Sequence, residues 1–407
     1  MHPILARPTD CPPDARSIEG VDLADALLDS RRRTLSLVEN LSDAQWQVPY
    51  ADGINPVAWE LGHLAWFAEF WILRGPHVAG ADGAVEARLP ARTAAPDTFF
   101  DSARIAHATR WQVALPSRPE LMTMLRDQLD ACVDALSGLA GDDALYFHRL
   151  ALFHEDMHAE ALTWLRARLG YPVPDGLELA GQPMREAVRM QGGDVRIGWQ
   201  PGCDGFAFDN ELPSCIVNIA PFEVDAQPLT AGEFLSFVES DGYANPDYWP
   251  GEGGAWLVAN SRRHPSRWRK VSVNGPWQTR WFDKWEDLDP RRPVIHVNAF
   301  EADAYCRWAG RRLPTPAEFE YAVAETSGGI FHWGHSVWEW TQASFEPCPG
   351  FEPGPYRDYS QPWFGSHREL RGGSFSATER MHDARYRNFF LPHRDDLFAG
   401  FRTVRQP

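Results

Sequence analysis

The sequence lacks a surplus of basic residues. Its 407 residues include 39 Lys+Arg against 56 Asp+Glu, which gives a formal net charge of −17. Binding to a nucleic-acid backbone needs a positive face, so this composition argues against a DNA- or RNA-binding protein. Long polar runs are also missing and 44% of the residues are hydrophobic, which excludes a mostly disordered chain. A chain of this length has room for two or three domains.

Closely spaced cysteines and long apolar runs are missing as well. The six cysteines form no CxxC pair, whereas a disulfide framework or a zinc ribbon would place them closer together, so we expect reduced thiols. No basic region followed by an apolar one stands at the start of the sequence. The most apolar stretch, Leu64 to Leu73, is interrupted by Glu69 and is too short to cross a bilayer. We therefore expect a cytoplasmic protein with neither a membrane nor a nucleic acid as partner.

The sequence pattern changes near residue 180. Before it, apolar residues recur at helical spacing in four stretches: Val21–Leu41, Pro56–Arg74, Arg118–Leu139 and Asp143–Leu169. After it come short β-like runs at 195–198, 216–219, 222–224 and Phe401–Val404, two helix-like pieces at Ala231–Glu239 and Ala299–Ala309, and a long loop at Phe345–Gly365. We predict a flexible N-terminus (1–18), an up-and-down four-helix bundle (19–178) and a loop-rich α+β domain (179–407).

Three histidines form the sharpest chemical pattern. His154 and His158 are four residues apart in His-Glu-Asp-Met-His, so one helix face can direct both imidazoles at one ion. His63 is the best third ligand, because it lies on the apolar face of another predicted helix among aromatic residues, where an unpaired imidazole is costly. Neutral imidazole suits iron, zinc, copper and nickel, so the spacing predicts a metal site without naming the metal.

Two other interpretations of these histidines stay open. The segment from His154 to His158 also matches the HExxH helix of zinc peptidases, in which Glu155 would be the general base. No Gly-rich continuation with a third ligand follows it, since the sequence reads as uninterrupted helix up to Gly170. Alternatively, no metal is bound, the helix histidines are incidental, and His63 is a core histidine bonded to a carbonyl.

The second half carries an ordered series of motifs. They are Pro293 to Asn298, Ala302 to Ala322, Val337-Trp-Glu-Trp-Thr341, Leu370-Arg-Gly-Gly-Ser-Phe375 and Gly400-Phe-Arg402. This series closely resembles the formylglycine-generating-enzyme-like domain, a variant of the C-type-lectin fold. Copper-dependent formylglycine enzymes use a reactive cysteine pair near the C-terminus, and no cysteine follows Cys348. The resemblance therefore implies the fold but disfavours that activity.

A helical DinB-like domain with His63 and His154-x-x-x-His158, fused to this second domain, resembles the non-heme iron synthases of thiohistidine and selenohistidine biosynthesis. The resemblance implies an Fe(II) site that activates O2 and couples sulfur or selenium to carbon 2 of the imidazole of hercynine, the Nα-trimethylated histidine. The family's iron-ligand positions fall onto His63, His154 and His158. Three neutral ligands leave coordination positions for O2 and both substrates, whereas a closed four-ligand zinc site leaves none.

Substrate recognition is also implied by the resemblance. Asn388 matches a family position that contacts hercynine, although on spacing alone it is equally well a turn-capping residue. A quaternary ammonium has no hydrogen-bond donor and must be recognised by aromatic faces. We assign Asn388, Tyr386, Phe389 and Phe390 to substrate binding, and further aromatic candidates are Trp363, Phe364 and Phe375.

The family divides by chalcogen donor. Some users of γ-glutamylcysteine carry an acidic residue two places after the Asn that contacts hercynine, and this chain has Phe390 there. Only Arg104 and Arg110 are candidates for binding a donor carboxylate, and His-Glu-Asp-Met-His looks like the selenoneine synthases. We predict a selenosugar donor, with an ergothioneine-type carbon–sulfur synthase using γ-glutamylcysteine or cysteine as the alternative. No catalytic acid is assigned, and Tyr356 and Tyr359 are only loop candidates.

Overall fold

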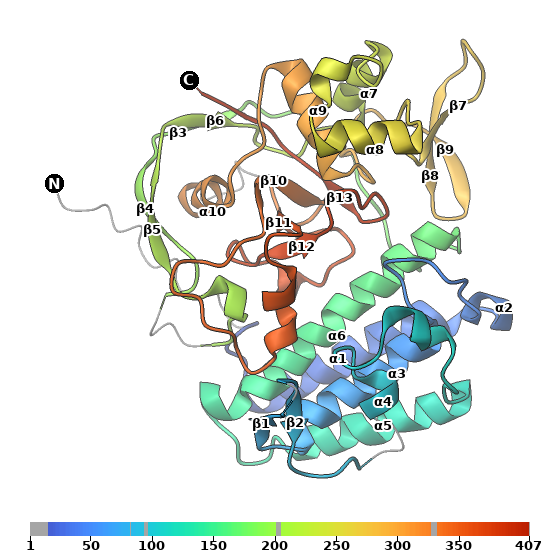
Figure 1. Cartoon of the computed structure of the whole chain (residues 1–407), viewed down its shortest axis with the longest axis vertical. Coiled ribbons are helices and arrows are strands. Elements are labelled where there is room, and N and C mark those ends of the chain that lie inside the picture. Colours follow the sequence, from blue (N-terminus) through green and yellow to red (C-terminus); the bar gives the residue numbers. More distant parts are fainter. Residues whose placement is uncertain (1–14, 82, 93–96, 201–204, 327–331, 407) are drawn as a thin grey trace.

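The computed structural model describes residues 15–81, 83–92, 97–200, 205–326 and 332–406. The first half is a bundle of the four expected long helices, α1 (Gly20–Glu39), α3 (Val57–Ala68), α5 (Arg118–Asp134) and α6 (Asp142–Leu169) (Figure 1). The π-helical turn η1 (Glu69–Leu73) continues α3. Apolar side chains of these helices, among them Leu61, Leu125 and Leu162, form one buried cluster.

Local sequence explains where the helices begin and end. A capping box joins Ser117 and Glu120 at the start of α5, and Gly170 ends α6 in the left-handed conformation with φ of 69°. The connection from α3 to α5 also holds a hairpin of β1 (His77–Ala79) and β2 (Val85–Ala87), the short helix α4 (Asp97–Phe100) and the turn η2 (His107–Trp111). Among the described residues, none of the helices is both long and apolar enough to cross a bilayer.

The second domain is built on a four-stranded sheet in the order β12 (Asn388–Phe390), β11 (Arg368–Gly372), β10 (Trp338–Ser344) and β13 (Ala399–Gly400). Strand β10 is antiparallel to β11 and parallel to β13. Three smaller sheets surround it, and they contain β3 (Val188–Met190), β4 (Gly193–Ile197), β5 (Cys215–Ile219), β6 (Phe222–Val224), β7 (Trp268–Lys270), β8 (Trp277–Trp281), β9 (Lys284–Asp287) and β14 (Val404–Arg405).

Four helices flank these sheets: α7 (Ala231–Glu239), α8 (Glu252–Asn260), α9 (Ala299–Ala309) and α10 (Pro316–Glu325). The sequence pattern predicted α7 and α9 but not α8 and α10. Helix α10 begins directly after Thr315, whose hydroxyl accepts the N–H of Glu318 in a capping box. The start signal was therefore present, within a motif that was interpreted by resemblance alone.

The structure differs from the sequence predictions near both ends of the chain. The predicted strand Phe401–Val404 is reduced to β14, because the backbone carbonyls of Phe401 and Thr403 accept from the loop residues Leu229 and Asp225. Of the N-terminal segment 1–18, residues 1–14 lie outside the described residues. Arg16 is 2% exposed and its Nη2 donates to Glu211 Oε1 at 2.8 Å, so this part is held against the second domain.

Helix α6 is the main contact of the bundle with the second domain (Figure 1). The Asp156 carboxylate accepts from Arg380 Nε at 2.5 Å and from Ser30 of α1 at 2.8 Å. At the C-terminal end of α6, Arg267 Nη1 donates to the carbonyl of Ala167 at 2.8 Å, which places a cation at the negative end of the helix. Helix α6 is therefore held at its middle and at its C-terminal end across the domain interface.

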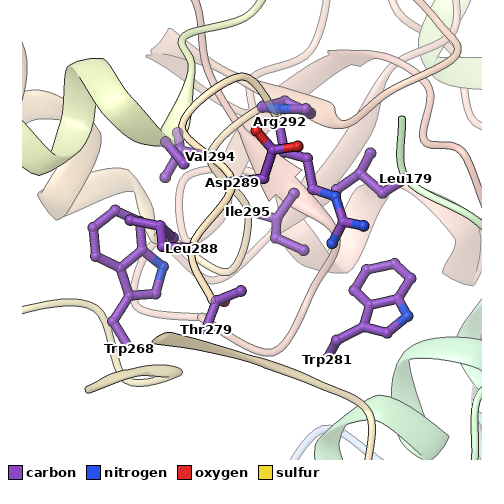
Figure 2. Close-up of a pocket in the computed structure, with 11 residues that line it drawn as sticks. Leu179, Trp268, Thr279, Trp281, Leu288, Asp289, Arg292, Val294 and Ile295 are labelled. Carbon is purple, nitrogen blue, oxygen red and sulfur yellow. The ribbon is translucent and has the colours of Figure 1, made fainter. Parts of the chain in front are cut away.

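Figure 2 shows a small cavity inside the second domain, where Trp268 and Trp281 lie below Leu288, Ile295 and Arg292. Its volume is about 20 Å³, which has room for a single water-sized molecule. The Arg292 guanidinium lies 5.8 Å from the centroid of the Trp281 ring. This cavity is a packing feature of the core and is too small for a substrate.

The Arg402–Glu339 pair supports a prediction about stability. Both side chains are fully buried, and Arg402 Nη2 lies 2.7 Å from Glu339 Oε1. Arg402→Ala leaves an unpaired buried carboxylate, so we expect a loss of about 3–5 kcal/mol in the free energy of unfolding. The control is Arg405→Ala, which breaks the pair of Glu223 with a half-exposed arginine and should cost less than about 1 kcal/mol. Urea titration measures both, and equal losses would contradict the prediction.

Candidate metal centre and substrate cleft

His63 of α3 and His154 and His158 of α6 converge on one point. One ring nitrogen of each lies within 4.8 Å of the corresponding atoms of the other two. His63 Nε2 and His154 Nε2 are 3.2 Å apart. Burial lowers the pKa of His63 to about 3 and that of His154 well below its ordinary value, so both rings are neutral at physiological pH. Neutral imidazoles with facing lone pairs are the donor set that a divalent transition metal accepts.

Hydrogen bonds at the opposite ring nitrogens orient two of these rings. His63 Nδ1 donates to the carbonyl of Phe100 at 2.7 Å, and His158 Nδ1 donates to Glu60 Oε2. Each bond leaves Nε2 free to face the cluster, as outer-shell partners of metal-bound histidines do. The core-histidine alternative predicted a carbonyl partner for His63, and that bond exists on the nitrogen that faces away from the other histidines.

The Glu60 carboxylate is buried at 3% exposure. Burial on its own would raise its pKa, but the neighbouring His158 and hydrogen bonds from His158 and Asn55 lower the pKa to about 2. Glu60 is therefore an ionised acceptor.

Close packing also sets the position of α3. A Cβ on Gly62 would lie 2.1 Å from the Phe100 ring, so only glycine admits Phe100 and its carbonyl beside His63.

The zinc-peptidase alternative is wrong, because Glu155 is held away from the histidines. Its carboxylate accepts from Arg31 Nε at 2.7 Å and from Nη2 at 3.0 Å inside the bundle. Residues one position apart on a helix point in different directions, and this one faces α1 rather than the cluster. The residue required as general base is therefore neutralised by a buried arginine.

A cleft of about 540 Å³ opens beside the histidines, between the two domains. His154 and His158 line it from α6, and the predicted substrate residues Tyr386, Asn388, Phe389 and Phe390 line it from the second domain. Trp363 also lines the cleft. Phe364 and Phe375 do not, because they pack against Phe345 at 4.8 Å and Phe398 at 4.7 Å, respectively.

Comparison with known proteins matches both halves of the chain. Residues 26–165 match the DinB superfamily, and residues 177–337 match the sulfatase-modifying factor enzyme 1-like domain. The hercynine oxygenase of Mycolicibacterium thermoresistibile is 30% identical over 440 residues, covering 94% of each chain. That of Mycolicibacterium smegmatis is 31% identical over 433 residues, covering 94% of this chain and 98% of the relative.

The chain belongs to the hercynine oxygenase family. The second domain alone is also similar to the formylglycine-generating enzyme of Streptomyces coelicolor, at 27% identity over 251 residues that cover 47% of this chain and 79% of the relative. The predicted fold class, a DinB-like bundle followed by a formylglycine-generating-enzyme-like domain, is confirmed.

In this member of the family, Glu160 is a cleft residue that the sequence patterns missed. It lies half a turn after His158, and its Oε1 accepts from Trp338 Nε1 at 2.8 Å and from the hydroxyls of Ser374 and Ser376. Burial raises its pKa, and the three hydrogen bonds partly oppose that shift. Nothing in the spacing of α6 marks this residue, since its partners come from the second domain.

The two loop tyrosines both reach the cleft. The ring centroid of Tyr356 lies 6.3 Å from that of His154, and its hydroxyl is hydrogen-bonded to Ser102. Tyr359 donates to the hydroxyl of Tyr386 at 3.3 Å, and Tyr386 donates to Met157 Sδ at 3.2 Å. Burial raises the pKa of all three phenols, so they carry their protons at neutral pH.

The two arginines considered for binding a donor carboxylate lie in different places. Arg110 of η2 lines the cleft, whereas Arg104 is not among the cleft residues and pairs with Asp101 at 3.2 Å. Arg104 is therefore removed from the candidates for contact with a substrate in this cleft.

Loss of a cluster histidine should abolish metal retention. We expect His154→Ala to hold less than about a tenth of the iron of the wild type after anaerobic loading with Fe(II) and desalting, because two imidazoles bind too weakly. The control, His77→Ala, removes a histidine that bonds to the Phe70 carbonyl at 2.8 Å outside the cluster, and it should keep its iron. Metal analysis by mass spectrometry gives the ratio, and full retention by His154→Ala would refute the site.

Proposed function

We propose that this chain is an O2-dependent non-heme iron enzyme that forms a carbon–selenium bond at carbon 2 of the hercynine imidazole, with a selenosugar as donor. The observation that carries the proposal is the convergence of three imidazoles at one side of an inter-domain cleft. The family supports the substrate, because its relatives are named hercynine oxygenases.

The three histidines are suitable ligands for iron. His63, His154 and His158 would hold it, and the cleft beside His154 and His158 leaves one side of the centre accessible. Bound Fe(II) would supply the activation of O2 next to both substrates. No fourth histidine, cysteine or carboxylate among the described residues joins this cluster, which agrees with an open catalytic site.

Hercynine has three groups for the protein to recognise. Its trimethylammonium group suits the buried Glu160 carboxylate and the Tyr386 ring, because a cation without donors is bound by negative charge and by aromatic faces. Asn388 Oδ1 accepts the N–H of Phe389 at 2.9 Å, so the amide nitrogen is the atom it offers to the substrate carboxylate. The imidazole then extends toward the metal centre.

Tyr356 is the proton-holding residue in this proposal. Its hydroxyl is hydrogen-bonded to Ser102 and its ring stands beside His154 and Phe67, at centroid distances of 6.3 and 5.0 Å. Because its pKa is raised by burial, the phenol remains protonated near neutral pH and can donate to an oxygen or nitrogen atom in the cleft.

One wall of the cleft favours an uncharged chalcogen donor. Trp363, Phe390 and His367 line this wall. Burial lowers the pKa of His367 to about 4, so its ring is neutral and can exchange hydrogen bonds with hydroxyl groups. Phe390 puts an aromatic face where an acidic residue would pair with the ammonium group of γ-glutamylcysteine. Aromatic faces with a few neutral polar groups suit a sugar.

The second candidate is an ergothioneine-type carbon–sulfur synthase that uses γ-glutamylcysteine or cysteine. One observation favours it: Arg110 lines the cleft, and a guanidinium binds a donor carboxylate well. The two functions share the metal centre and the hercynine site and differ only in the donor.

One turnover experiment distinguishes the two functions. Anaerobic iron-loaded protein receives hercynine with either a selenosugar or γ-glutamylcysteine, then air, and mass spectrometry identifies the products. We expect a selenium adduct of hercynine from the first mixture at a rate at least about tenfold above that of the sulfur adduct, which is a 1.4 kcal/mol difference in barrier. A faster sulfur adduct would support the second candidate, and no adduct from either donor would contradict both.

Phe390 gives a sharper test of donor choice. Phe390→Asp introduces a carboxylate for the ammonium group of γ-glutamylcysteine, and we expect the ratio of kcat/KM for this donor over the selenosugar to rise about tenfold. The matched control is Phe390→Asn, which has the same size as Asp but no charge and should leave the ratio near that of the wild type. Equal ratios in the two variants would show that position 390 does not face the donor.

A further inference from the structure

The cleft residue Arg110 is connected to two of the three cluster histidines by separate contacts. We infer that Arg110 is a positioning residue that couples occupancy of the cleft to the geometry of the metal centre. The metal and the cleft ligand follow from the proposed function, on which this inference rests. The contacts themselves lie within the described residues of the bundle.

The first connection is a chain of hydrogen bonds to His158. Arg110 Nη1 donates to Asn55 Oδ1 at 2.7 Å, and Asn55 Nδ2 donates to Glu60 Oε1 at 2.7 Å. Glu60 Oε2 in turn accepts from His158 Nδ1. The Asn55 amide uses its oxygen on one side and its nitrogen on the other, so a rotation of this amide breaks both bonds. A shift of the guanidinium is therefore passed on to the carboxylate that orients His158.

The second connection passes through Trp59 to His63. The guanidinium carbon of Arg110 lies 3.9 Å from the centroid of the Trp59 ring, and the same indole stacks on His63 at 4.7 Å with an interplanar angle of 9°. Trp59 is 1% exposed, and its Nε1 donates to the Phe99 carbonyl at 2.7 Å. The next carbonyl, that of Phe100, accepts from His63. Arg110, the indole and the imidazole are thus packed as one unit.

One N–H donor of the guanidinium is unpaired in this structure. Within the described part of the chain, its Nε is buried and has no hydrogen-bond partner. The charged or titratable groups that act on it are Glu60 and Tyr356, both beside the metal centre. The backbone of η2 is anchored, since His107 Nε2 bonds to the Ile54 carbonyl and Trp111 Nε1 to that of Val48, each at 2.8 Å. Only the side chain of Arg110 is left to respond to a carboxylate or hydroxyl group in the cleft.

These contacts imply reciprocal coupling. A ligand that draws the guanidinium into the cleft changes the support of His158 and His63, and so changes the affinity for metal. By thermodynamic linkage the metal changes the affinity for that ligand by the same factor. Loss of an outer-shell partner typically lowers metal affinity by about 10–100-fold.

Co(II) titration without any substrate tests the positioning role. We expect Arg110→Gln and Asn55→Ala each to raise the Co(II) dissociation constant about tenfold or more and to alter the visible absorption of bound Co(II). The matched control is Arg118→Gln, because Arg118 also lies over an indole, Trp46 at 4.7 Å, and donates to the Glu39 carbonyl at 2.8 Å, but away from the cleft. It should bind Co(II) within twofold of the wild type.

Wild-type affinity and absorption in both Arg110→Gln and Asn55→Ala would overturn the inference. If Arg110→Gln does not fold, Asn55→Ala still tests the hydrogen-bonded connection, and thermal unfolding of the metal-free proteins shows which variants are folded. Arg110→Lys, which keeps a donor for Asn55 but loses the planar stack on Trp59, should recover part of the affinity.

Hercynine titration by calorimetry tests the coupling itself. The ratio of hercynine affinities in the Co(II)-loaded and metal-free wild type should be at least threefold larger than the same ratio in Arg110→Gln. An unchanged ratio would overturn the coupling. If no form binds hercynine while the Co(II) effects of Arg110→Gln persist, the proposed substrate is wrong and the positioning role stands.

Discussion

The hydrogen bonds that His63 and His158 donate from Nδ1 are the constraint on which the site depends. An imidazole can direct either nitrogen at a metal, and the acceptor opposite decides which one is free. Here the acceptors are the Phe100 carbonyl and Glu60, both buried, so the free Nε2 atoms of two helices meet at one point. Without these acceptors, the Nδ1 atoms of both rings would lack a hydrogen-bond partner.

Helix α6 connects the histidine cluster to both domains. Between 154 and 160, successive side chains serve different neighbours: the histidines face the cluster, Glu155 pairs with Arg31 of α1, Asp156 binds Arg380 and Glu160 accepts from Trp338. Because α6 contacts the bundle and the second domain within two turns, this one helix carries part of the cleft wall together with two of the three cluster histidines. The cleft residues of the second domain are thereby placed at a defined position relative to the histidine cluster.

Much of the fold followed from patterns of local origin. The four long helices were predictable because apolar residues recur at helical spacing and because turn and cap signals such as Ser117 with Glu120 mark their ends. Helix α10 and the reduced strand β14 were missed for different reasons. The capping box at Thr315 was visible in the sequence, whereas the loop partners of Phe401 and Thr403 arise only when distant segments pack together.

The sequence by itself determined which residue types were available for chemistry: a His-x-x-x-His helix, a third histidine among aromatics, and an Asn-Phe-Phe segment in a recognisable domain. Only the tertiary structure decided their roles. It separated Glu155 from the histidines, brought Arg110 rather than Arg104 to the cleft, and made Glu160 a cleft residue. The physical reason is that helical periodicity states which residues share a face, while the partners that orient, neutralise or desolvate them come from segments distant in the chain.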